Sequence, residues 1–206
     1  MHMKIPHKTY LLIEGTDLAG KTTAATNFIA NRSDAWDLRH NSLLNAPNSL
    51  SDIADQMVES GEYGKTTINL AYAASILVDI DMFAWPRENT VQESVNIVRS
   101  IGHAHVNNDR DVENILMNAL ERYPEFDSAF YLTADLESRL ARLAVRTNQS
   151  VNDMLVVKDP KKFFAIDDVA KSIAVERFGA KLIDTSKLSQ DDVQYILSQE
   201  VFGPNS

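Results

Sequence analysis

An apolar segment, a glycine-rich turn and a helix-forming stretch follow one another directly near the start of the chain. Residues 15–22 read GTDLAGKT and satisfy the pattern G-x-x-x-x-G-K-[ST]. The segment 9–14 before them is short, apolar and rich in β-forming residues, whereas residues 20–31 have a helical composition. A buried strand, a phosphate-binding loop and a helix in this order favour a parallel α/β architecture.

The residue types of this loop suit the binding of a triphosphate. A Cβ atom at Gly15 or Gly20 would obstruct backbone amides that must turn inward around the phosphates. We expect Lys21 to reach the β- and γ-phosphates and the Thr22 hydroxyl to coordinate Mg²⁺. The predicted cofactors are ATP and Mg²⁺. The predicted cofactor-binding residues are Gly15, Thr16, Asp17, Leu18, Ala19, Gly20, Lys21, Thr22 and Thr23.

The rest of the chain alternates between strand-like and helix-like segments. Further strands are predicted at 36–40, 90–93, 127–133 and 181–183. Helices are predicted at 51–60, 66–83, from about 94, and at 136–147, 160–178 and 190–199. The expected fold is a doubly wound, five-stranded parallel α/β sheet with helices on both faces, in one domain that spans residues 1–206.

The composition limits the partners of such a domain. With 206 residues, 44% of them hydrophobic, the chain can build one sizeable core. A formal charge of −9 argues against broad electrostatic binding to nucleic acid or to an anionic membrane. The chain has no cysteine, and its first apolar stretch is too short for a signal sequence or a membrane span. A cytoplasmic protein without nucleic-acid or membrane partners is expected.

Residues 10–29, YLLIEGTDLAGKTTAATNFI, resemble the opening of the thymidylate kinases. The pattern of that family is E-G-x-[DE]-x-A-G-K-[ST]-[ST], so Glu14, Asp17 and Ala19 match outside the general phosphate-loop motif. A fainter similarity continues through 70–77, 130–147 and 179–193. The resemblance implies a P-loop kinase fold and the ATP- and Mg²⁺-dependent transfer of a phosphoryl group to a nucleoside monophosphate-like acceptor.

The resemblance also implies roles for single residues. Asp17 would hold a sugar hydroxyl of the acceptor. Leu18 stands where some family members carry a loop arginine, while others supply that cation from a mobile lid. A polar segment at about 146–160 is the candidate lid, and Arg142, Arg146 and Lys158 flank it. We favour Arg142 and Arg146 as catalytic cations beside Lys21, with a solvated basic helix face as the alternative.

Two family motifs are altered. The Asp-Arg-Tyr motif falls on 90–100, TVQESVNIVRS, where Glu93 can replace the aspartate near the metal or the acceptor hydroxyl and Ser94 replaces the arginine. An Ala-Ala-Asp-Arg pattern falls on AASI, which places Ser75 and Ile76 at the last two positions. Both missing arginines normally bind the phosphate of the acceptor. Arg99 is a candidate relocated clamp, and Arg39, Asn41 and Tyr72 are further candidates for the acceptor pocket.

Three functions therefore remain open from the sequence. The acceptor is a nucleoside monophosphate, or it is a nucleoside or another hydroxylated small molecule without a phosphate, or the chain binds nucleotides without transferring phosphate. A GTPase is disfavoured because the guanine-binding sequence Asn-Lys-x-Asp does not occur. The alanine-rich segment 70–80 is either a homodimer face or core packing.

Overall fold

The computed structural model describes residues 8–46, 48–147 and 153–203, and its strands form one parallel sheet. The strand order is β2-β3-β1-β4-β5, and every pairing is parallel. The strands are β1 (Tyr10–Glu14), β2 (Trp36–His40), β3 (Asn89–Glu93), β4 (Ser128–Thr133) and β5 (Lys181–Asp184). The prediction of a five-stranded parallel sheet is confirmed.

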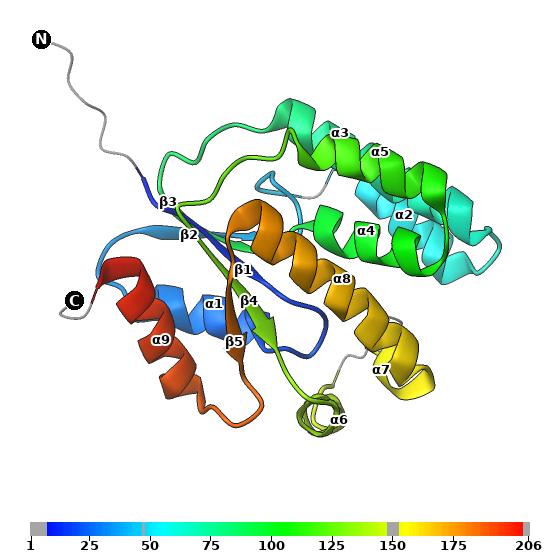
Figure 1. Cartoon of the computed structure of the whole chain (residues 1–206). Helices are drawn as coiled ribbons and strands as arrows, with labels where there is room; N and C mark the ends of the chain where they lie inside the picture. The colour runs from blue at the N-terminus through cyan, green and yellow to red at the C-terminus, as the bar shows by residue number, and fades with distance from the viewer. Residues whose placement is uncertain (1–7, 47, 148–152, 204–206) are drawn as a thin grey trace, which may run out of the picture.

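Helices cover both faces of this sheet (Figure 1). On one face lie α1 (Lys21–Ala30) and α9 (Gln190–Phe202). On the other face lie α3 (Lys65–Met82), α4 (Asn96–Val106), α5 (Arg110–Leu120) and α8 (Pro160–Phe178), and α2 (Ser49–Ser60) packs on α3. Two shorter helices, α6 (Leu136–Ala144) and α7 (Leu155–Lys158), lie between β4 and α8 along the chain.

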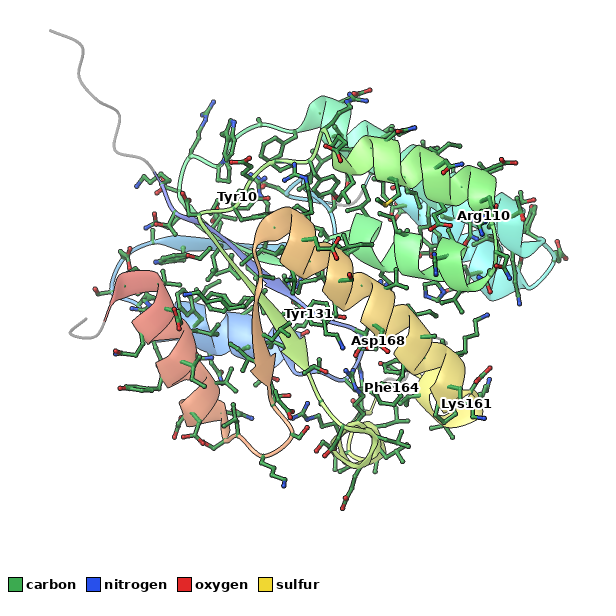
Figure 2. The ribbon with its side chains drawn as sticks, viewed as in Figure 1. Tyr10, Arg110, Tyr131, Lys161, Phe164 and Asp168 are labelled. Atoms are coloured by element: carbon green, nitrogen blue, oxygen red, sulfur yellow. The ribbon has the colours of Figure 1, made fainter. Side chains whose placement is uncertain are left out.

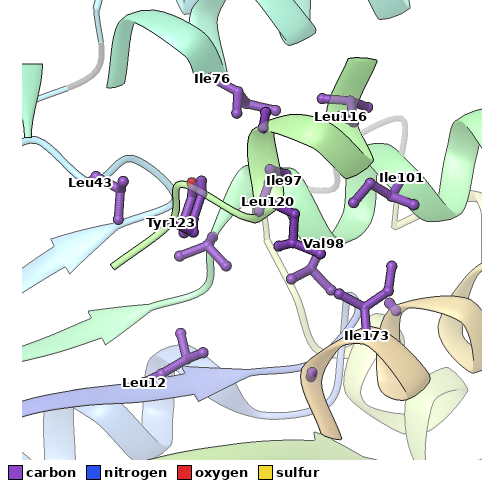
Figure 3. Close-up of a cluster of buried hydrophobic side chains, with 14 of the residues drawn as sticks. Leu12, Leu43, Ile76, Ile97, Val98, Ile101, Leu116, Leu120, Tyr123 and Ile173 are labelled. Carbon is purple, nitrogen blue, oxygen red and sulfur yellow. The ribbon is translucent and has the colours of Figure 1, made fainter. Parts of the chain in front are cut away.

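The central strand β1 shows why the sheet is covered on both sides. Leu11 and Ile13 belong to the apolar cluster beneath α1 and α9, whereas Leu12 points into the cluster formed by α3, α4, α5 and α8 (Figure 3). All five residues of β1 are buried, and the first four form a continuous apolar run, as expected for a strand covered on both faces. This double burial fixes β1, and with it the start of the loop at residue 15.

The structure differs from the sequence prediction mainly around residues 94–120. The helix expected from about 94 begins only at Asn96, because Ser94 adopts a left-handed backbone with φ of 63°. This helix ends at Val106, and the separate helix α5 after it was not predicted. The left-handed Asn108, with φ of 55°, lies in the turn between the two helices. The predicted helix 136–147 ends earlier, at Ala144.

Two other predictions concern the lid and the membrane. Part of the expected lid at 146–160 falls on residues 148–152, which lie outside the described residues. Within the ranges that the structure describes, no helix combines the length and the apolar character needed to cross a membrane.

Candidate functional site

The loop between β1 and α1 lines a cavity at one edge of the sheet. Gly15 has φ of 145°, and a Cβ atom there would lie 2.3 Å from the Leu132 carbonyl oxygen on β4. A glycine is therefore required where the loop passes the neighbouring strand. Gly20 has φ of 98° and precedes α1 without any side-chain cap, so the first amides of this helix are available to an anion.

The cavity has a volume of about 780 Å³ and lies at the carboxyl edge of the parallel sheet. Most of the predicted site residues line it. These are Asp17, Leu18, Ala19, Gly20, Lys21, Thr22, Thr23, Asn41, Glu93, Arg99, Arg142 and Arg146. Gly15, Thr16, Arg39 and Tyr72 are not among the lining residues.

Thr22 and Glu93 supply oxygen ligands of the kind that Mg²⁺ prefers. The Thr22 hydroxyl, at the start of α1, donates to Glu93 Oε1 at the end of β3 across 2.5 Å. The ammonium of Lys21 donates to the Thr16 carbonyl oxygen at 3.1 Å, so it lies folded against the loop. No cluster of three or more Asp, Glu, His or Cys side chains with metal-binding geometry occurs among the described residues. The site thus suits an ion that is held jointly by protein and phosphate oxygens.

The carboxylate of Glu14 joins the phosphate loop to the end of β3. It accepts hydrogen bonds from the Gly15 amide at 2.8 Å, the Ser94 hydroxyl at 2.8 Å and the Val95 amide at 2.7 Å. Burial raises the pKa of Glu14, while Lys21 and these hydrogen bonds oppose the rise. Ser94 stands at the position of the missing family arginine. Its hydroxyl is hydrogen-bonded to Glu14, and the residue does not line the cavity.

A buried polar network beneath the loop was missed by sequence reasoning. Asp167 on α8 accepts from the Thr16 hydroxyl at 2.5 Å and from the Tyr131 hydroxyl at 2.7 Å. Figure 2 shows Tyr131 on β4 where the strand passes α8. Arg139 on α6 lies 3.5 Å from Asp167 and also donates to the Asp17 carbonyl oxygen. Arg139, three residues before Arg142 in the predicted helix 136–147, is completely buried and supports the loop.

The slot of the family's loop arginine holds an apolar contact instead. Leu18 has a left-handed backbone with φ of 66° and is buried with Leu143, Val156 and Phe163, which lie on α6, α7 and α8. Phe164, labelled in Figure 2, packs against the same cluster. Leu18 therefore anchors the loop on the helices that surround the predicted lid.

The two predicted catalytic arginines have different surroundings. Arg142 donates to the carbonyl oxygens of Leu18 and Thr185, both at 2.8 Å, and to the Thr185 hydroxyl at 3.0 Å. These contacts tie its guanidinium between the phosphate loop and the end of β5. Arg146 lies at the cavity wall with about half of its side chain exposed, and it pairs with the buried Asp153 at 2.9 Å.

Asp17 and Arg99 form an ion pair in the cavity. Arg99 Nη1, on α4, lies 3.1 Å from Asp17 Oδ1. Burial alone would raise the pKa of Asp17, but Arg99, Lys21 and His103 hold it below its usual value. The pKa of His103 falls to about 4, because the ring is buried and lies near Arg99 and Lys162. The two predicted acceptor residues Asp17 and Arg99 are thus brought together and neutralise each other.

The other acceptor candidates are placed differently. Asn41 lines the cavity after β2, beside His40, whose Nδ1 lies 2.6 Å from Glu93 Oε2. Arg39 is buried, and its Nη1 donates to the Leu43 carbonyl oxygen at 2.6 Å. The Tyr72 hydroxyl donates to Asp55 Oδ1 at 2.5 Å.

The segment after β5 forms another part of the cavity wall that was not predicted. The residues of this segment that line the cavity are Thr185, Leu188, Ser189, Gln190, Val193 and Gln194. Asn27 on α1 also lines the cavity and was not predicted. A usable signal was present in the sequence. Ligands of open parallel sheets bind beyond the carboxyl ends of the strands, and residue 185 lies two positions after the end of the predicted strand 181–183.

No protein-family model matches the chain, and no curated protein matches it in sequence. Solved structures do match. The thymidylate kinase of Candida albicans has a TM-score of 0.69 at 16% identity, over 94% of this chain and 91% of that one. A deoxyadenosine kinase of M. mycoides with bound dATP has a TM-score of 0.64 at 14% identity, over 93% and 99%.

A thymidylate kinase of Ehrlichia chaffeensis aligns with a TM-score of 0.63 at 12% identity, over 95% of this chain and 99% of that one. The described elements form the five-stranded parallel sheet with helices on both faces that the sequence predicted. The fold of this chain is therefore that of the thymidylate kinase-like P-loop kinases.

Proposed function

We propose that this protein is an ATP- and Mg²⁺-dependent phosphotransferase that acts on a nucleoside monophosphate-like or nucleoside acceptor. The observation that carries the proposal is the geometry of the loop at residues 15–22. Its glycines adopt backbone conformations that other residues rarely adopt, its helix N-terminus is uncapped, and Lys21 and Thr22 line one cavity with Glu93. Similar folds in kinases of nucleosides and nucleotides support the choice of acceptor class.

The residues of this chain would divide the work between positioning and charge neutralisation. Mg²⁺–ATP supplies the phosphoryl group and part of the positive charge when it is bound. The loop amides and Lys21 hold the phosphate oxygens, and Thr22 and Glu93 hold the metal or its water ligands. Arg146 lies at the cavity wall, where a cation can approach the transferring group.

A second reading has its own supporting observation. Ser94 stands in place of the family arginine, and its hydroxyl is bound to Glu14 rather than directed into the cavity. A chain that retained nucleotide binding but had lost transfer would carry such a change. Turnover distinguishes this reading from the first.

The test uses the full chain with ATP, Mg²⁺ and a panel of nucleosides and monophosphates, with ADP production as the readout. Calorimetry should detect Mg²⁺-dependent binding of a non-hydrolysable ATP analogue, and at least one acceptor should raise ADP production above slow hydrolysis. Lys21→Ala should lower turnover by about a thousandfold, because Lys21 neutralises the phosphates. The control Lys171→Ala removes a lysine of α8 that pairs with Asp168, outside the cavity, and should have little effect.

Binding without turnover with any acceptor would favour the non-catalytic reading. Absence of Mg²⁺-dependent nucleotide binding, or an unchanged Lys21→Ala variant, would contradict both.

A further inference from the structure

The cations that line the cavity all have protein partners on the part of the chain that is described. Arg142 binds Leu18 and Thr185, and Arg146 binds Asp153. The remaining basic side chains are Lys21, which belongs to the phosphate loop, Arg99, which pairs with Asp17, and His40, which pairs with Glu93. The undescribed residues 148–152 read NQSVN, so this stretch adds no basic side chain.

The family resemblance implies positions for a clamp on the acceptor phosphate, but the residues at these positions are buried and do not line the cavity. Ser94 is buried and donates its hydroxyl to Glu14 at 2.8 Å. Ile76 is 1% exposed and packs in the core with Ile97 and Leu116 (Figure 3). Arg39 is directed to the Leu43 carbonyl oxygen and lies outside the cavity lining. None of these positions supplies a positive charge to an incoming ligand.

Apart from Lys21, Arg142 and Arg146, Arg99 is the one lysine or arginine among the described lining residues, and Asp17 has already neutralised it. The pair is separated by 3.1 Å, and the Asp17 and Arg99 side chains are only 19% and 28% exposed. A phosphate of the acceptor would therefore meet a neutral pair and the carboxylate of Glu93, which already pairs with His40 at 2.6 Å. Burial of a phosphate without a cation is unfavourable, whereas an uncharged ligand avoids this desolvation penalty.

We infer that the acceptor carries no phosphate, and that the Asp17–Arg99 pair is the element that selects against one. This inference rests on the proposed kinase function. The acceptor is then an uncharged molecule of nucleoside size with a hydroxyl group, and the pair offers it a hydrogen-bond acceptor and donors. The hydroxyl oxygen forms a bond to the γ-phosphorus, the bond from that phosphorus to the β–γ bridging oxygen breaks, ADP leaves with the electron pair, and the hydroxyl proton passes to water.

Calorimetry on the full chain with Mg²⁺ and a non-hydrolysable ATP analogue tests this inference. The probes are matched pairs, namely thymidine with dTMP and deoxyadenosine with dAMP. At least one nucleoside should bind tenfold or more tightly than its own monophosphate, and ADP production with ATP should show the same preference. Tighter binding of the monophosphates would overturn the inference, and so would binding of neither member of either pair.

Asp17→Asn removes the charge that neutralises Arg99 while it preserves the shape of the side chain. The ratio of nucleoside to monophosphate affinity should shift at least tenfold toward the monophosphate in this variant. The matched control Asp37→Asn changes an exposed aspartate on β2 that does not line the cavity, and its ratio should equal that of the wild type. An unchanged ratio in a folded Asp17→Asn variant would refute the selecting role of the pair. If that variant does not fold, the wild-type ratio still decides the acceptor class.

The two proposals fail in different ways. If the ATP analogue does not bind, the kinase proposal and the inference fall together. If the analogue binds and a monophosphate is the phosphorylated acceptor, the kinase proposal stands and the inference is wrong.

Discussion

The guanidinium of Arg139 lies 3.5 Å from the carboxylate of Asp167, and both side chains are almost completely buried. Arg139 belongs to α6 and Asp167 to α8, and they meet beneath the phosphate loop. Asp167 also accepts a hydrogen bond from the Thr16 hydroxyl, and Arg139 donates one to the Asp17 carbonyl oxygen. The backbone of the loop is thus held from below by two helices that are distant in sequence.

Asp167→Asn should destabilise the protein by about 3–5 kcal/mol, because it leaves the buried Arg139 without an opposite charge. Chemical denaturation monitored by circular dichroism measures this change. Asp168→Asn is the matched control, since Asp168 is exposed and pairs with Lys171 only at the surface, and it should cost less than about 1 kcal/mol. Equal effects of the two substitutions would show that the buried network does not stabilise the fold.

Gly15→Ala tests the close approach of the loop to β4. Its Cβ atom would lie 2.3 Å from the Leu132 carbonyl oxygen, so the backbone must shift, and the cost should exceed about 3 kcal/mol. Gly61→Ala is the control, because Gly61 also has a positive φ of 67° but its Cβ would meet nothing within 4 Å. It should cost about 1 kcal/mol. Thermal denaturation measures the loss of stability in both variants. Equal losses would show that the close approach of Gly15 to β4 is not what makes the alanine unfavourable.

Glu93→Gln should raise the Mg²⁺ concentration needed for half-maximal turnover and lower kcat by about a hundredfold. The reason is that the carboxylate that accepts the Thr22 hydroxyl loses its charge beside the expected metal. Initial rates over a Mg²⁺ titration measure both effects. Glu88→Gln, at an exposed residue that pairs with Lys8, should leave the titration unchanged. A normal Mg²⁺ requirement in Glu93→Gln would exclude Glu93 from the metal site.

The stability of the protein should fall as the pH decreases from about 6.5 to 4, in part because of His103. Burial and the charge of Arg99 lower the pKa of this ring from 6.5 to about 4 in the folded state. Between these values the unfolded chain binds the proton and the folded chain does not, so unfolding becomes easier by up to roughly 3 kcal/mol. Above pH 6.5 the ring is neutral in both states and contributes no pH dependence.

His103→Gln should flatten this part of the stability profile, as measured by denaturant titrations at a series of pH values. The exposed His105 is the control, and His105→Gln should keep the wild-type slope. A His103→Gln profile parallel to that of the wild type would show that other groups account for the loss.

The sequence by itself determined the fold class and the position of the glycine-rich loop between β1 and α1. The glycines, Lys21 and Thr22 specify local backbone and chemistry, and the apolar runs specify buried parallel strands, so these features follow from neighbouring residues. The helix start at Asn96 was missed, because the left-handed conformation of Ser94 accompanies hydrogen bonds to distant residues. The separate helix α5 was not predicted, because the turn that precedes it at Asn108 was not recognised in the sequence.

Only the tertiary structure decided how the charged residues are paired. Arg39, Arg99, Arg139 and Arg142 looked alike in the sequence, as basic side chains near a predicted site. In the fold, the first supports a backbone carbonyl, the second neutralises Asp17, the third is buried beneath the loop, and the fourth joins the loop to β5. These contacts join residues from separate strands and helices. The energetic effect of a charged side chain depends on its burial and on its partner, and the local sequence specifies neither.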